Sequence, residues 1–131
     1  MNNLSNLKSS KGFTLVEVMI AAYILLIGIG GTLLLYVDCM NSSQFAWDST
    51  VATTHAQYIL EEMQNQMDLS VITGTDWDNW AKKQNLNILP GESFQVLYAD
   101  PSADPLAIQV NVQWQRKNTP SRISLATILT R

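Results

Sequence analysis

The sequence predicts an α+β fold in which a long N-terminal helix packs on a small antiparallel β-sheet of three or more strands. Two observations lead to this prediction. Apolar side chains recur at helical spacing in the first half of the chain, and apolar and polar side chains alternate in the second half. The length of 131 residues fits one compact domain.

The N-terminal segment combines a short basic leader with a long apolar run. Residues 1–12 are polar and contain Lys8 and Lys11 but no acidic residue. Residues 18–37 are all uncharged, and eleven of them are Leu, Ile or Val. A helix of this length spans the roughly 30 Å hydrocarbon core of a bilayer. Because the lysines precede the run, we expect the N-terminus on the cytoplasmic side of a membrane.

Glu17 distinguishes this segment from simpler alternatives. A cleaved secretory signal has an apolar run of about 7–15 residues before a small-residue cleavage site, whereas this run is longer and has no such site. A lipoprotein signal needs small residues before its cysteine, but residues 36–38 before Cys39 are large or charged. A plain single-pass anchor explains the length but not a carboxylate, which costs about 2.5 kcal/mol or more deep in a bilayer.

Residues 11–18, with the sequence KGFTLVEV, resemble the class III signal of type IV prepilins and of the related pseudopilins of secretion systems. The resemblance implies that a prepilin peptidase cleaves between Gly12 and Phe13 on the cytoplasmic side and then methylates the new N-terminus at Phe13. It also implies that the apolar helix stays attached to the mature chain. The glutamate of the family, five residues after the cut, coincides with Glu17 without a gap.

The resemblance gives Glu17 a role in assembly and in helix register, and electrostatics supports that role. After cleavage, Phe13 carries a new α-ammonium that can pair with Glu17 of a neighbouring subunit. In a helix bundle of low dielectric constant, this pairing offsets the desolvation of the carboxylate and sets the axial register. The alternative is a carboxylate that only reaches the lipid headgroups.

Three parts are predicted along the chain. Residues 1–12 form the leader, residues 13–37 form the transmembrane half of the helix that becomes the filament core, and residues 38–131 form a periplasmic head. The resemblance places the protein in the bacterial inner membrane before assembly and then in a filament in the periplasm and at the cell surface. The implied partners are prepilin peptidase, the inner-membrane assembly platform, the major pilin and other minor pilins.

One helix is predicted from Phe13 to about Met67. After the apolar run, neither Gly nor Pro interrupts an apolar stripe with spacings of three and four residues. The glycines at positions 28, 30 and 31 either allow close packing between helices or create a zone that melts in a filament. The stripe consists of Ala52, Ala56, Ile59, Leu60, Met63 and Met67.

A second, short helix is predicted near residues 75–80. Thr75 or Asp76 is a suitable N-cap for it. Asp76 and Asp78 together also suggest calcium, but a calcium ion takes six to eight oxygen ligands, so capping is the preferred interpretation. Residues 87–92, with the sequence NILPGE, are predicted to form a turn.

Three strand-like segments follow and predict an antiparallel meander with one face against the long helix. Residues 94–98 alternate between apolar and polar, residues 108–115 do so most regularly, and residues 123–130 close the chain. The connecting segments 100–105 and 116–121 are rich in turn-forming residues. This order of elements is also that of the pilin fold.

The sequence contains no pattern that predicts catalysis. Since it has no nucleophile motif, phosphate-binding loop or metal-ligand cluster, we expect a protein that is not an enzyme and has no cofactor or metal. A net charge of −3 offers no basic face for nucleic acid.

His55 is expected to be a structural or surface residue. Cys39 is expected to be a buried or filament-facing thiol, with pairing between subunits as an alternative.

Within the family, the chain most resembles minor pilins of the pilus-modification group. This resemblance rests on the glycine-rich segment 27–31, residues 61–63 near the end of the helix, the turn at 89–91 and the strand residues 112–114. It implies a structural subunit that primes or joins a type IV pilus, in a complex at its tip. A minor pseudopilin of a type II secretion system and a single-pass membrane protein with a periplasmic interaction domain are the alternatives.

Overall fold

The computed structural model describes residues 12–66 and 68–130. The predicted leader, apart from Gly12, and Met67 of the predicted stripe lie outside these residues. The chain divides into two compact units between Ser42 and Ser43. The elements of the described residues are α1 (Leu15–Asn65), α2 (Leu69–Gly74), α3 (Trp77–Lys83), β1 (Ser93–Tyr98), β2 (Leu106–Arg116) and β3 (Thr119–Leu129).

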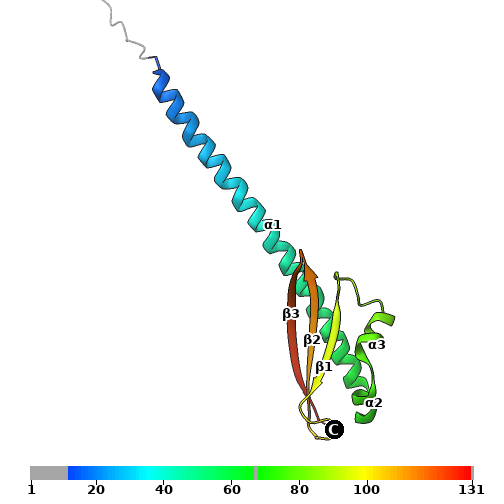
Figure 1. Ribbon diagram of the computed structural model, residues 1–131. Coiled ribbons are helices and arrows are strands. Elements are labelled where there is room, and N and C mark those ends of the chain that lie inside the picture. The colour runs from blue at the N-terminus through cyan, green and yellow to red at the C-terminus, as the bar shows by residue number, and fades with distance from the viewer. Residues whose placement is uncertain (1–11, 67, 131) are drawn as a thin grey trace, which may run out of the picture. The chain divides into compact units, whose positions relative to one another are not determined.

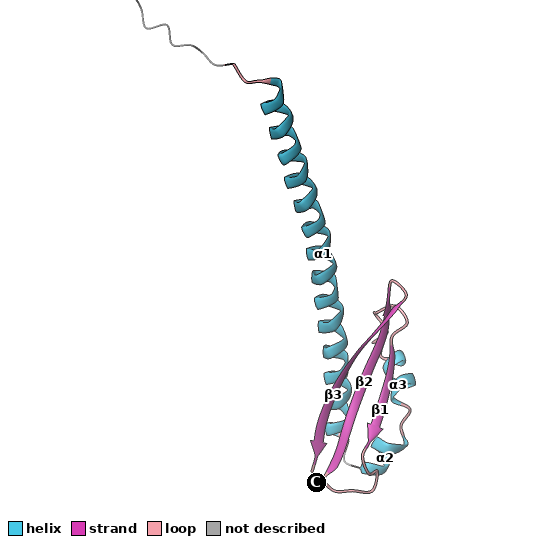
Figure 2. Ribbon diagram, turned by 60° about the vertical axis from the view of Figure 1, so that its left-hand side comes forward, coloured by secondary structure: helices cyan, strands magenta, loops and turns pink. Residues whose placement is uncertain are grey.

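The long helix and the antiparallel sheet confirm the predicted α+β, pilin-like arrangement. Within the described residues, the sheet has three strands in the order β1-β2-β3, and both neighbouring pairs are antiparallel. Figures 1 and 2 show the strands beside the second half of α1, with α3 next to β1. The meander forms because each pair of consecutive strands is joined by a loop or turn short enough to bring neighbours together.

The core of the second unit lies between α1 and the inner face of the sheet. The predicted stripe on the helix is confirmed, since Ala52, Ala56, Ile59 and Met63 are fully buried. The regular alternation on β2 is confirmed as well, because a central strand with one covered face buries every second side chain. The inward-facing side chains of β2 are Leu106, Ile108, Val110, Val112 and Trp114.

The hairpin between β2 and β3 is tighter than predicted. Residues 116–121 were expected to be a connector, but only Lys117 and Asn118 form the turn, and both have positive φ, 46° and 64°. Two central residues with positive φ are typical of the hairpin turn whose twist matches that of the strands. Pro120 therefore lies inside β3, where it is tolerated because β3 is an edge strand.

Two short helices connect α1 to the sheet, and only α3 was predicted. The side chain of Asp76 accepts a hydrogen bond from the Asn79 N–H at 3.2 Å, which confirms Asp76 as the N-cap of α3. The side chain of Asp68 caps α2 in the same way, by accepting from the Ser70 N–H at 2.9 Å. Helix α2 was not predicted because six residues are too few to show a helical period.

The predicted turn before β1 is confirmed. The Glu92 N–H donates to the Leu89 carbonyl at 3.2 Å, and Gly91 has a φ of 64°. Proline and glycine at the two central positions are the usual residues for a turn that needs positive φ at its third residue. The carbonyl of Pro90 accepts a hydrogen bond from the Gln115 N–H at 2.8 Å, so the turn is held against β2.

Candidate functional site

The candidate site is the start of α1, where Thr14 and Glu17 organise the first turn. The Glu17 N–H donates to the Thr14 Oγ1 at 3.3 Å, and the Val18 N–H donates to the Thr14 carbonyl at 3.2 Å. Threonine followed by glutamate three residues later is a typical helix-start pattern. The helix therefore begins at Leu15, two residues later than predicted.

Glu17 lies in the first turn of α1 and is exposed. A carboxylate in this position interacts favourably with the partial positive charge of the helix N-terminus. This local role of Glu17 was not among the predicted roles, which were assembly and contact with lipid headgroups. The first turn thus provides a reason for a carboxylate at residue 17 that needs no second subunit.

Gly12 and Phe13 precede the helix and are accessible. Neither residue belongs to a helix or strand, both are exposed, and Phe13 is 82% exposed. Exposed chain segments outside helices and strands are the preferred sites of proteolytic cleavage. The predicted cut between these two residues therefore falls on accessible backbone just before α1.

The apolar run forms uninterrupted helix and is exposed in the first unit. Its large side chains from Leu15 to Val37 are 51% exposed or more. Among the described residues, one helix, α1, is long enough and apolar enough to cross a membrane. Helix continues through Gly28, Gly30 and Gly31, and a methyl group at any of them would meet no atom outside its own helix within 4 Å. The two interpretations of these glycines therefore both stay predictions.

Comparison with family models addresses this same segment. A model described as the prokaryotic N-terminal methylation motif matches residues 7–33. The segment carries the methylation motif. The match supports a type IV pilin-like protein with a class III signal, and it includes Gly12, Phe13, Glu17 and the glycines of the helix. Comparison with curated proteins and with solved structures found no match.

The methylation motif and the long apolar helix together are consistent with anchoring in the inner membrane before assembly. The motif also implies processing by prepilin peptidase and pilus assembly in general. It does not distinguish a pilin from a pseudopilin, because both families carry this signal.

His55 belongs to a buried pair that the sequence analysis did not predict. Its Nδ1 lies 2.7 Å from Oε1 of Glu92, and the side chains are 7% and 0% exposed. The other carboxylate oxygen of Glu92 accepts a hydrogen bond from the Leu89 N–H at 2.9 Å. His55 is therefore a structural residue and not a surface residue, the two alternatives that were predicted. No signal in the sequence connects residues 55 and 92, because 37 positions separate them.

The remaining predicted residues are Cys39, Asp76 and Asp78. Cys39 is an exposed free cysteine in the single chain, so of the expected alternatives a filament-facing thiol and pairing between subunits stay predictions. Asp78, like the N-cap Asp76, has a structural role. It accepts a hydrogen bond from the Phe94 N–H at 2.9 Å and pairs with Lys82. Within the described residues, no group of three or more His, Cys, Asp or Glu side chains could hold a metal ion.

Proposed function

We propose that this chain is a minor pilin of a type IV pilus, a non-catalytic structural subunit that joins the pilus or primes its assembly. The observation that carries the proposal is the methylation motif at residues 7–33. It stands directly before an exposed apolar helix, and that helix continues into a small α+β unit. An apolar helix without a cover in its own chain needs lipid or neighbouring helices.

In this proposal the N-terminal residues act in sequence. Prepilin peptidase cleaves between Gly12 and Phe13 and methylates Phe13. Glu17 then pairs with the Phe13 ammonium of a neighbour in the filament, where the low dielectric constant strengthens the attraction. The exposure of both residues in the single chain leaves them accessible for these contacts.

The partners follow from this route. The protein is proposed to sit in the inner membrane as a single-pass protein, to be handed to the assembly platform, and to join other minor pilins and the major pilin. We place it in a complex at the pilus tip, as the resemblance to the pilus-modification group implies.

Mass spectrometry of the chain purified from its native membrane tests the proposal. We expect a protein that begins at Phe13 and carries one added methyl group on its N-terminus. A mutant strain without prepilin peptidase is the control and should yield the full chain without the methyl group. A full-length chain in the unmodified strain would contradict the proposal and favour a single-pass membrane protein with a periplasmic interaction domain.

A minor pseudopilin of a type II secretion system is the second candidate, because the methylation motif fits it equally. A deletion strain distinguishes the two. Loss of twitching motility or DNA uptake with normal enzyme export supports the minor pilin. Loss of enzyme export with normal motility supports the pseudopilin.

A further inference from the structure

The C-terminal strand β3 is an open edge of the sheet within the described residues. The strand order β1-β2-β3 leaves one side of β3 without a neighbouring strand. The strand is eleven residues long, and it pairs with β2 in one continuous register from Arg116↔Thr119 to Leu106↔Leu129. A long, regular edge presents a row of backbone donors and acceptors that another strand can pair with.

The inward-facing side chains of β3 are only partly covered. Ile123, Leu125 and Leu129 pack against the core but remain half-buried. On the neighbouring strand β2, Val110 and Val112 face the same side and are fully buried. The difference arises because β2 has a strand on each side and β3 has one. A fourth strand beside β3 would complete the burial of this row.

The second half of β3 lacks the usual protection of an edge. Edge strands in soluble proteins commonly carry charges, prolines or bulges that prevent pairing. Pro120 and Arg122 lie at the beginning of β3, whereas residues 123–129 contain neither a charge nor a proline. This part of the edge is therefore open to pairing.

The opposite edge of the sheet is covered. Helix α3 packs against β1, as Figure 2 shows. The Phe94 N–H on this strand donates to Asp78 Oδ1 at 2.9 Å. With this backbone donor already satisfied and α3 packed beside it, β1 is less open to a new strand than β3 is. Within the described residues, β3 is therefore the more open edge, on which the sheet can grow.

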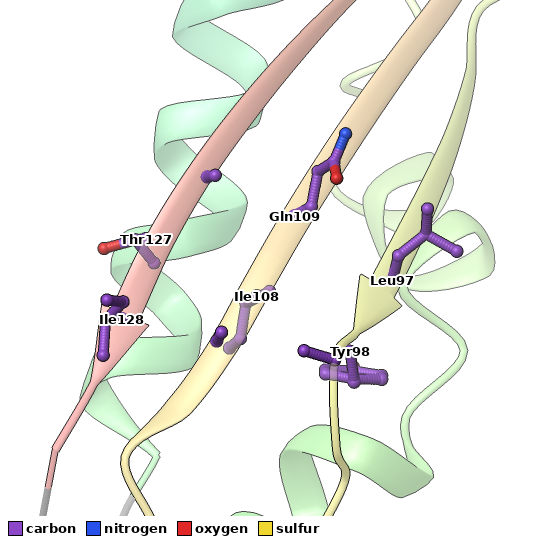
Figure 3. A pocket seen from close by; sticks show the side chains of 9 residues that line it. Leu97, Tyr98, Ile108, Gln109, Thr127 and Ile128 are labelled. Atoms are coloured by element: carbon purple, nitrogen blue, oxygen red, sulfur yellow. The ribbon is translucent and has the colours of Figure 1, made fainter.

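An apolar hollow on the outer face of the sheet extends to the open edge. Its volume is about 490 Å³. Figure 3 shows Leu97, Gln109 and Ile128 along it, one side chain from each of the three strands. Ile128, on the edge strand, is 66% exposed. Outward-facing apolar side chains of an added strand would lie beside Ile128 and extend this apolar surface.

The charge of the β2–β3 hairpin specifies the partner further. Residues 106–130 contain Arg116, Lys117 and Arg122 but no acidic residue, although the whole chain is acidic. Arg116 already lies 3.8 Å from Asp48. The exposed Arg122 lies at the beginning of β3, so the edge is cationic near the hairpin and apolar beyond it. A complementary strand has a carboxylate opposite Arg122 and apolar side chains farther along.

A second copy of this chain does not fit the edge. Two β3 strands that pair antiparallel are related by a two-fold axis perpendicular to the sheet. The strands run beside the second half of α1 (Figures 1 and 2), so this axis would reverse the direction of that helix in the second copy. Two subunits in one membrane or one filament have the same direction. Parallel pairing of β3 with β1 of another copy is unfavourable because α3 packs against β1.

We propose that the β3 edge binds an extended strand of a different protein, one that is apolar along residues 123–129 and acidic opposite Arg122. The partner adds a fourth strand to the sheet by backbone hydrogen bonds. The exclusion of a second copy rests on the proposed function, because it assumes subunits that share one membrane or filament.

A synthetic peptide with the sequence of residues 106–116 tests the proposal, because β3 already accepts this sequence on its other side. In that register residue 113 lies opposite Arg122. We expect the peptide with Gln113→Glu to bind the full-length protein in detergent about fivefold more tightly than the peptide with Gln113→Lys, measured by fluorescence anisotropy. The variant Arg122→Glu should reverse this preference. The matched control Lys83→Glu, which makes the same charge change on α3, should not.

Cysteine cross-linking locates the bound peptide. The register pairs Gln109 with Ala126, so a peptide with an activated Gln109→Cys should form a disulfide with the protein variant Cys39→Ser/Ala126→Cys. The control variant Cys39→Ser/Gln95→Cys, on the covered strand β1, should remain unmodified.

Three results would overturn the proposal. They are no binding of any peptide, equal cross-linking on β1 and β3, and disulfide-linked dimers of the Ala126→Cys protein that exclude the peptide. Cleavage between Gly12 and Phe13 is measured independently, so a failure of the docking proposal is distinguishable from a failure of the proposed function.

Discussion

His55 Nδ1 lies 2.7 Å from Glu92 Oε1, and this buried pair joins the second half of α1 to the turn that precedes β1. The carboxylate is fully removed from water and also accepts the Leu89 N–H. A buried carboxylate is stable only when its oxygens are satisfied. The pair therefore requires the helix and the turn to be correctly placed at the same time.

Removal of one partner from this pair should strongly destabilise the protein. We expect Glu92→Ala to lower the free energy of unfolding by about 3 kcal/mol, because it leaves His55 and the Leu89 N–H without their partner. Urea unfolding in detergent measures the effect. A double-mutant cycle with His55→Ala should give a clear coupling energy, and a cycle without coupling would contradict the assigned role. The control Lys82→Ala, in a partly exposed pair with Asp78, should cost less than about 1 kcal/mol.

Two buried tryptophans provide a matched comparison of a satisfied and an unsatisfied indole. Trp77 Nε1 donates to the Ile72 carbonyl at 2.8 Å and contacts Tyr98 Oη at 3.1 Å. Trp114 Nε1 is buried and has no hydrogen-bond partner among the described residues. We expect Trp77→Phe to cost about 1 kcal/mol more than Trp114→Phe, the typical net value of a hydrogen bond. Equal losses in urea unfolding would show that the indole hydrogen bonds contribute nothing.

Gly91 has a left-handed backbone conformation that favours glycine over other residues. At a φ of 64°, a Cβ would find ordinary contacts at 3.6 Å or more with Gln115, so space is available and only conformation is unfavourable. We expect Gly91→Ala to destabilise by about 1 kcal/mol. Gly74→Ala, in helix α2 with open space around it, should be neutral or stabilising. Thermal unfolding of the two variants compares them, and a larger loss at Gly74 would refute this account.

Acid should weaken the second unit partly through Asp76. Hydrogen bonds from the backbone and side chain of Asn79 lower the pKa of Asp76 below its ordinary value of 3.8. Because the folded state favours the ionised carboxylate, its stabilisation is present above pH 3.8 and is lost as the pH falls through the lowered folded pKa. Unfolding followed from about pH 6 to about pH 3 should show this loss. The variant Asp76→Asn should have a smaller pH dependence in this window, and an unchanged one would contradict the assignment.

Glu17 is expected to act in assembly rather than in processing. We expect Glu17→Ala to leave cleavage between Gly12 and Phe13 largely intact and to reduce incorporation into filaments, because the neighbour's ammonium loses its partner. Immunoblots of sheared filaments and of membranes measure both steps. Thr14→Val, which removes the helix-cap hydrogen bond, is the control and should incorporate normally. Normal incorporation of Glu17→Ala, or equal defects in both variants, would exclude the register role.

Several parts of the fold were predictable because they depend on neighbours close in the sequence. The stripe on α1 and the alternation on β2 appear as periods of 3.6 and 2, which the chain carries without knowledge of its partners. The cap at Asp76 and the turn at Gly91 are local as well. The hairpin was predicted too long because its twist, rather than its composition, selects the two residues Lys117 and Asn118.

The sequence by itself determined the methylation motif, the apolar helix and the order of helix and strands, since each is a pattern of adjacent or regularly spaced residues. The tertiary structure decided that His55 meets Glu92, that α3 packs against β1, and that β3 is an edge strand without a further neighbour among the described residues. These relationships join residues far apart in the chain, and they follow from which faces pack together. Burial and edge exposure are properties of the assembled sheet and helix, so they become visible only when the elements are in place.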